Sequence, residues 1–166
     1  DGAPMSRAPF PLICAVLLVS CAGNPPISEN ATGVKAGRFY TFWRDAGSGE
    51  MRLGQDGSYS VQWKLGQTGN LVAGTGWASG ALDRIVRYTA QIFEPGQNGY
   101  LTLYGWSLNP LVEYYIVENW GDFEPPGDSG TYLGTVDSDG ATYRIYRTRR
   151  IDQPSITGTA TFDQYW

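Results

Sequence analysis

The sequence predicts an all-β protein, a sandwich or barrel of short strands. Apolar and polar residues alternate with the period of two that half-buried strands show, as in "SYSVQW" (58–63) and "LVEYYIVE" (111–118). Turn-forming residues separate these runs, for example "PGQNG" (95–99) and "SDG" (138–140), and no stretch of a dozen residues shows a capped amphipathic helix. The chain has 22 glycines, 11 tyrosines and 6 tryptophans in 166 residues, which favours strands joined by tight turns.

The first 21 residues are predicted to be a leader peptide. In "MSRAPFPLICAVLLVSCAG" (5–23), one arginine precedes an apolar stretch and a group of small residues, which is the order of a secretory signal. The apolar stretch is too short for a stable membrane anchor. A buried N-terminal strand or helix is the alternative. The leader therefore predicts a secreted protein. Since "LVSC" (18–21) resembles a bacterial lipobox, Cys21 would carry a lipid anchor if that motif is used.

Residues 22–36 are predicted to be a flexible linker, since they contain two prolines and no periodic apolar pattern. One folded domain is then expected over 37–166, long enough to bury a core without disulfides. Both cysteines, Cys14 and Cys21, lie in the leader, so the domain has no disulfide or thiol chemistry.

The strands of this domain have faces of different chemistry. "YLTLYGW" (100–106) places tyrosine, threonine and tryptophan on one face and two leucines on the other. The leucine face is expected to pack between sheets. A face of tyrosine and tryptophan suits partial exposure and stacking on sugar rings, because each ring has an apolar body and a polar group. The alternative is that these rings fill a second core layer.

Glu113 is a charged residue inside an apolar strand. It shares a face with Tyr115, and Tyr104 is expected to lie across from this pair if the turn at 107–109 preserves the facing. A buried carboxylate must be neutral or compensated, or else face a wet cleft. A carboxylate among tyrosines indicates a functional site, whereas the alternative is a solvated surface glutamate.

The composition excludes several classes of function. A formal net charge of −4 and a pI near 4.7 argue against a nucleic-acid binder. The chain has no histidine, which excludes histidine-based zinc sites, Ser-His triads and Cys-His pairs. We expect neither a metal nor a cofactor. Acid–base chemistry would fall to carboxylates, tyrosine, lysine or arginine, and a neutral polymer suits the aromatic, weakly charged surface.

Six collinear segments between about Phe39 and Trp166 closely resemble family 11 glycoside hydrolases, the small endo-β-1,4-xylanases. They are "FYTFWRDAGSG" (39–49), "GSYSVQW" (57–63), "GNLVAGTGW" (69–77), "NGYLTLYGWSLNPLVEYYIVENWG" (98–121), "GTYLGTVDSDGATYRIY" (130–146) and "QPSITGTATFDQYW" (153–166). The resemblance implies a β-jelly-roll sandwich of two mostly antiparallel sheets, with a cleft for xylan and xylo-oligosaccharides on its concave face and a thumb hairpin over the cleft. We expect a monomer.

The resemblance also implies roles for individual residues. Glu113 in "PLVEYY" matches the nucleophile of a retaining reaction, which forms a covalent glycosyl-enzyme. Arg150 matches an arginine near the nucleophile that would keep Glu113 ionised. The other matched positions contact the substrate or the catalytic groups: Tyr104 and Tyr115 around the nucleophile, Trp43 stacking on a distal xylose, Pro154 with Ser155 and Ile156 at the thumb tip, Gln164, and Asn70, which matches the partner of the acid/base residue.

No residue of this sequence matches the acid/base glutamate of the family. Glu118 falls on the opposite face of the strand from Glu113, and Glu94 and Glu124 lie in loops without a matching role. We therefore expect a domain that is incomplete at its C-terminus. General acid assistance contributes roughly 10²–10⁴-fold, so the 166-residue chain alone should have negligible xylanase activity.

Two other functions stay open. The first is a non-catalytic xylan-binding sandwich, which would not require Glu113 together with Arg150. The second is a structural envelope lipoprotein, which would require a lipidated Cys21 and a cleft filled by side chains.

Overall fold

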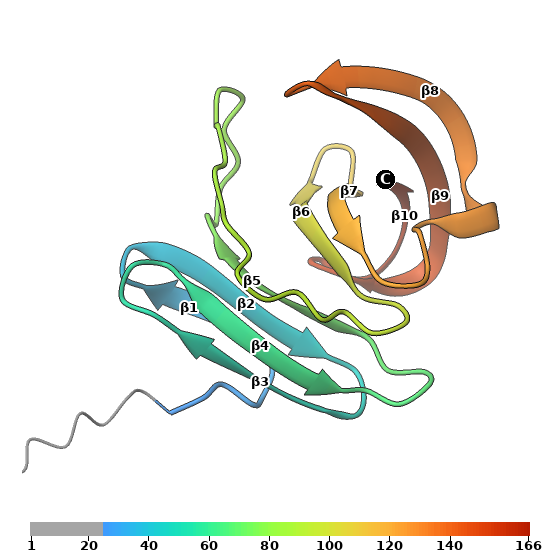
Figure 1. Cartoon of the computed structure of the whole chain (residues 1–166). Coiled ribbons are helices and arrows are strands. Elements are labelled where there is room, and N and C mark those ends of the chain that lie inside the picture. The colour runs from blue at the N-terminus through green and yellow to red at the C-terminus, as the bar shows by residue number, and fades with distance from the viewer. Residues whose placement is uncertain (1–24) are drawn as a thin grey trace, which may run out of the picture. The chain divides into compact units, whose positions relative to one another are not determined.

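The computed structural model describes residues 25–166, which contain ten strands, β1 to β10 (Figure 1). These residues form two compact units, one ending at Ile85 and one covering Val86–Trp166. No α-helix occurs among the described residues, and a short 3-10 helix, η1 (Gly127–Ser129), lies in the second unit. The prediction of an all-β protein is confirmed. The leader predicted over residues 1–21 lies outside the described range.

The first unit contains a three-stranded and a two-stranded antiparallel sheet. The first sheet has the order β1 (Ala31–Lys35), β2 (Arg38–Arg44) and β5 (Leu71–Gly76), and the second pairs β3 (Ser48–Leu53) with β4 (Tyr59–Lys64). Phe42 of β2 is 1% exposed and Met51 of β3 is fully buried. Burial of these two large side chains removes apolar surface from water and stabilises the unit.

The prediction of a flexible linker over 22–36 is wrong for its second half. Ala31–Lys35 pair with β2, and the main-chain groups of Ile27 and Met51 exchange two hydrogen bonds of 2.8 Å. The side-chain amide of Asn30 donates to the carbonyl oxygen of Arg44 and accepts from its N–H, at 3.0 and 2.8 Å. The apolar pattern could not reveal this strand, because it is held by main-chain and amide hydrogen bonds while Val34 stays exposed.

The second unit is one five-stranded sheet with the order β6-β7-β10-β9-β8. All neighbours in it are antiparallel except β7 and β10, which run parallel. Figure 1 shows β8 and β9 as a long curved ribbon. The strands are β6 (Tyr100–Ser107), β7 (Val112–Trp120), β8 (Thr131–Ser138), β9 (Ala141–Ser155) and β10 (Gly158–Tyr165).

The register of this sheet brings together residues that are far apart in the sequence. Glu113 of β7 lies opposite Trp106 of β6 on one side and opposite Gln164 of β10 on the other. Gln164 is in turn opposite Thr148 of β9. Side chains at paired positions project from the same face of a sheet, so these four residues form a row across four strands.

The face that carries Glu113 is the better packed face of this unit. The rings of Trp106 and Phe162 lie 4.9 Å apart, and Phe162 is only 3% exposed. On the other face, Leu103 and Ile116 are 36% and 41% exposed. The aromatic side chains of 100–106 are only half-buried, so their expected partial exposure is met. The expected packing of the leucine face is not seen within this unit, where Leu103 stays exposed.

Candidate active site

Glu113 is buried in the middle of the sheet, and both of its carboxylate oxygens accept a hydrogen bond. Only 7% of the residue is exposed. The hydroxyl of Tyr104 donates to its Oε1 at 2.7 Å, and the Nε2 amide of Gln164 donates to its Oε2 at 2.6 Å. Each carboxylate oxygen thus has one donor, which compensates much of the cost of burying a charge. The side chain is therefore a structured carboxylate, unlike a solvated surface glutamate.

Two tyrosines lie beside this carboxylate. The rings of Tyr104 and Tyr115 are 5.1 Å apart. Burial, reinforced by the negative charge of Glu113, raises the pKa of both hydroxyls far above the ordinary tyrosine value. Both phenols consequently stay protonated over the whole range in which proteins work, so they act as hydrogen-bond donors. The indole N–H of Trp106 donates to the Tyr104 oxygen at 2.7 Å, which fixes that ring.

Arg150 lies near this group without touching Glu113. Its Nη2 donates to Oε1 of Gln153 at 3.2 Å, and among the described residues no hydrogen bond or ion pair joins Arg150 to Glu113. Its positive charge lowers the pKa of Tyr115, against the larger effects of burial and Glu113. That Arg150 keeps Glu113 ionised stays a prediction.

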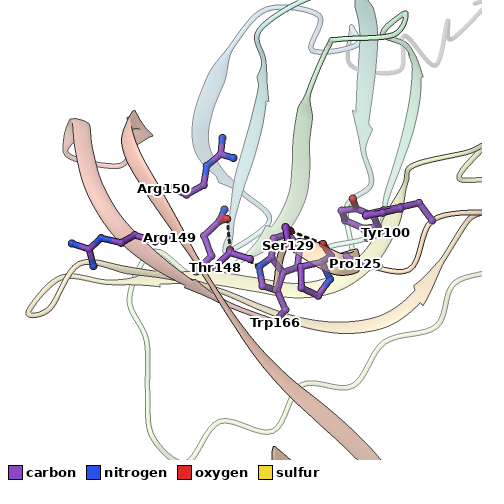
Figure 2. Close-up of a pocket in the computed structure, with 10 residues that line it drawn as sticks. Tyr100, Pro125, Ser129, Thr148, Arg149, Arg150 and Trp166 are labelled. Atoms are coloured by element: carbon purple, nitrogen blue, oxygen red, sulfur yellow. Dashed lines mark hydrogen bonds between the residues drawn. The ribbon is translucent and has the colours of Figure 1, made fainter. Parts of the chain in front are cut away.

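A cavity of about 340 Å³ opens beside the row of polar residues (Figure 2). Its walls include Tyr100, Thr148, Arg150, Gln164 and Trp166. The Trp166 ring stacks on Tyr115, with centroids 4.0 Å apart and planes 5° from parallel, and meets Tyr100 edge-on at 6.2 Å. An aromatic wall with polar groups at its edge is suited to a ring that has an apolar face and hydroxyl groups.

Residues predicted at the thumb tip lie in the β9–β10 hairpin. Pro154 of β9 pairs with Thr159 of β10, and the Ser155 hydroxyl donates to the carbonyl oxygen of Gly158 at 2.6 Å. Ile156 is 56% exposed at the turn. The structure therefore places the three residues at a hairpin end, and their contact with a substrate stays a prediction.

Trp43 and Asn70 belong to the first unit. Trp43 lies in β2 opposite Val72. Asn70 directly precedes β5, and its main-chain N–H donates to Oδ1 of Asp45 at 2.6 Å. Their predicted roles, in stacking on a xylose and in partnering the acid/base residue, stay predictions.

Two residues that sequence reasoning did not single out belong to this site, Thr148 and Trp166. The indole Nε1 of Trp166 donates to Oγ1 of Thr148 at 3.0 Å, and this hydroxyl donates to Oε1 of Gln164 at 2.9 Å. No local pattern marks them, because their importance depends on the pairing of β9 with β10. Within residues 25–166 no cluster of His, Cys, Asp and Glu could hold a metal ion, and no helix there has the length and hydropathy to cross a membrane.

Comparison with known proteins agrees with this architecture. A family model described as glycosyl hydrolases family 11 matches residues 35–166. Over 142 residues, the chain is 47% identical to "Endo-1,4-beta-xylanase 11A" of Botryotinia fuckeliana (strain B05.10), which covers 84% of this chain and 60% of the relative. It is 49% identical over 136 residues to "Ethylene-inducing xylanase" of Hypocrea rufa, covering 81% of this chain and 59% of the relative.

A third relative, "Probable endo-1,4-beta-xylanase B" of Aspergillus clavatus, is 47% identical over 141 residues, which is 84% of this chain and 62% of that protein. The chain thus spans about 60% of the length of these curated relatives. The match to the family over most of the sequence, together with the all-strand architecture, confirms the predicted β-jelly-roll class. The chain belongs to the glycosyl hydrolases of family 11.

Proposed function

We propose that this protein is an endo-1,4-β-xylanase that cleaves internal bonds of xylan with retention, and that Glu113 is its nucleophile. The observation that carries the proposal is the state of Glu113, which is 7% exposed yet hydrogen-bonded at both oxygens. Keeping a carboxylate buried and compensated is costly, and a surface that only binds a neutral sugar has no need of it. Relatives at 47–49% identity that are named xylanases supply the substrate class.

The reaction would proceed in two displacements. A carboxylate oxygen of Glu113 attacks the anomeric carbon of a xylose residue, the glycosidic C–O bond breaks, and the departing oxygen takes a proton from an acid. Water then attacks the anomeric carbon, returns a proton to the conjugate base of that acid, and releases Glu113. Such retaining pairs place the two carboxyl groups about 5–5.5 Å apart.

Glu113 has no catalytic carboxyl partner within the second unit as the structure describes it. Glu118 is on the opposite face of β7, where its Oε1 accepts a hydrogen bond from Tyr143 at 3.0 Å. Burial is the main cause of the raised pKa values of Tyr104 and Tyr115, and among the described residues Glu113 is the carboxylate that adds to it. We therefore propose that the acid/base carboxyl lies outside this group of residues and that the 166-residue chain alone cleaves xylan poorly.

The cavity beside Glu113 would hold part of the xylan chain. Trp166 and Tyr100 offer aromatic surfaces, and Arg150 and Gln164 offer donors to sugar hydroxyls. The remaining predictions belong to the same proposal: contact of Trp43, Asn70 and Pro154 with the substrate or catalytic groups, secretion, and a monomeric state. The alternative to a freely secreted protein is one that a lipid on Cys21 anchors at the cell surface.

A mechanism-based label tests the nucleophile without requiring the acid. A dinitrophenyl 2-deoxy-2-fluoro-β-xylobioside has a leaving group that departs without protonation, and the fluorine slows hydrolysis of the covalent intermediate. Mass spectrometry of the 166-residue chain should show one fluoroxylobiosyl adduct, located by peptide mapping at Glu113, and none in Glu113→Gln. Absence of the adduct in a folded chain that still binds xylan would refute the enzyme and support the xylan-binding module.

A further inference from the structure

A chain of hydrogen bonds connects the wall of the cavity to Glu113. The indole N–H of Trp166 donates to the Thr148 hydroxyl at 3.0 Å, and that hydroxyl donates to Oε1 of Gln164 at 2.9 Å. The amide Nε2 at the other end of Gln164 donates to Oε2 of Glu113 at 2.6 Å. Figure 2 shows Thr148 and Trp166 close together at the cavity. The chain therefore runs in one direction, from an indole to the carboxylate.

The orientation of the Gln164 amide decides whether this chain supports Glu113. An amide group has a donor end and an acceptor end of almost the same shape. As oriented, Nε2 faces the carboxylate and Oε1 faces Thr148. A rotation by half a turn would place Oε1 against the carboxylate oxygen, so two acceptors would face each other at 2.6 Å. Repulsion between them would displace Glu113.

Thr148 selects the productive orientation from the other side. Gln164 is 8% exposed, so its amide oxygen depends on a partner within the protein. The Thr148 hydroxyl has one hydrogen to donate, and since it already accepts from the indole of Trp166, that hydrogen is directed toward Gln164. Threonine is also stiff at χ1, because it is branched at Cβ.

We propose that Thr148 is a positioning residue for the nucleophile: it fixes the amide of Gln164 so that its N–H holds the carboxylate of Glu113 in the orientation for attack. This inference rests on the proposed role of Glu113. The residue acts through Gln164 and does not itself contact the reacting atoms. Trp166 begins this chain of hydrogen bonds. Its indole N–H sets the direction of the Thr148 hydroxyl, and its ring stacks on Tyr115.

The substitutions Thr148→Val and Thr148→Ser separate the hydroxyl from the shape of the side chain. Valine keeps the branched shape and removes the hydroxyl, whereas serine keeps the hydroxyl. Thr142→Val is the matched control. Thr142 lies in the same strand β9 and its hydroxyl donates to Asp137 at 2.6 Å, but both residues are exposed and lie away from the cavity.

The measurement is the kinetics of labelling of the 166-residue chain by the fluoroxylobioside, followed through dinitrophenolate release. The rate of labelling, measured at several concentrations of the fluoroxylobioside, gives the limiting rate and the concentration at which the rate is half-maximal. Thr148→Val should lower the limiting rate about tenfold, the size expected for loss of one hydrogen bond in a charged network. The half-maximal concentration should change less than about twofold, Thr148→Ser should recover most of the rate, and Thr142→Val should match the parent chain.

Several results would overturn the inference while leaving the proposed function intact. These are an unchanged limiting rate in Thr148→Val, an equal loss in Thr148→Ser, or a change confined to the half-maximal concentration, which would make Thr148 a wall of the cavity only. If the unsubstituted chain is not labelled at Glu113, the proposed function fails instead, and the inference fails with it.

A second measurement needs no substitution, so it holds even if Thr148→Val does not fold. In the unsubstituted chain, the side-chain amide protons of Gln164 should exchange with solvent at least tenfold more slowly than those of exposed Gln62, because one of them is bonded to the buried carboxylate. Equal exchange rates would show that the Gln164 amide is not held and would overturn the inference.

Discussion

Replacing Tyr104 by phenylalanine tests how Glu113 is held. The change keeps the ring, so packing against Tyr115 at 5.1 Å is retained, and removes one oxygen. That oxygen has two partners, since it donates to Oε1 of Glu113 at 2.7 Å and accepts from the indole of Trp106 at 2.7 Å. The variant therefore leaves Glu113 with its single bond from Gln164, and leaves the Trp106 N–H without an acceptor.

The expected size of the effect follows from these contacts. A hydrogen bond to a charged group contributes about 1.5–3 kcal/mol, which corresponds to a change of roughly 10- to 150-fold in rate. At 7% exposure little water can replace the lost donor, so one oxygen of the attacking carboxylate loses the bond that orients it. We expect the limiting rate of labelling by the fluoroxylobioside to fall within that range in Tyr104→Phe.

The matched control is Tyr143→Phe. This removes another tyrosine hydroxyl that donates to a glutamate, Glu118, at 3.0 Å, but that hydrogen bond is exposed and lies on the other face of the sheet. Surface changes of this kind alter the free energy of unfolding by less than about 0.5 kcal/mol, and we expect no change in labelling. If Tyr104→Phe is labelled as fast as Tyr143→Phe, the hydrogen bond to Oε1 does not support the nucleophile.

Three further predictions concern stability. The pKa values of Tyr104 and Tyr115 are raised in the folded state, so the unfolded chain loses these protons first as pH rises. The free energy of unfolding should therefore fall above about pH 10, by up to about 1.4 kcal/mol per pH unit for each tyrosine. Urea titrations from pH 8 to 11 would show no such slope if the hydroxyls ionise normally. Phe42→Ala should lower the free energy of unfolding by about 3–5 kcal/mol, measured by urea denaturation, since Phe42 is 1% exposed; a loss below about 1 kcal/mol would contradict its place in the core. Asn30→Ala should cost about 1–2 kcal/mol through loss of its two bonds to Arg44, and a neutral result would mean that β1 does not depend on them.

The strands that could be predicted from the sequence are those with alternating residues. The runs at 58–63, 100–106 and 111–118 coincide closely with β4, β6 and β7, because alternation with a period of two matches the alternating side chains of a strand. β1 was missed for the opposite reason. Its segment, "ATGVK", has one large apolar residue, Val34, which stays exposed, and it is held by main-chain bonds that leave no trace in an apolar pattern.

The site could be predicted in part for a similar reason. Alternation alone places Glu113 and Tyr115 on one face, and a short turn brings Tyr104 to that face in the neighbouring strand. The position of Gln164 depends on β10 pairing in parallel with a strand 51 residues away, and local pattern has no information on such a pairing. Gln164 was therefore identified through the family resemblance, and Thr148 only through the structure.

The chemistry of the groups that bond to Glu113 bears on whether the domain is an enzyme or a non-catalytic xylan-binding module. Its partners are neutral, a phenol and an amide, while the guanidinium of Arg150 bonds to Gln153. A guanidinium bound to both oxygens would occupy lone pairs on each of them and draw away charge that an attack on carbon needs. Neutral donors take up single lone pairs, which leaves others on the carboxylate free for an attack. A module that only binds a neutral sugar gains nothing from a carboxylate buried in its sheet, so this arrangement supports the proposed enzyme over the binding module.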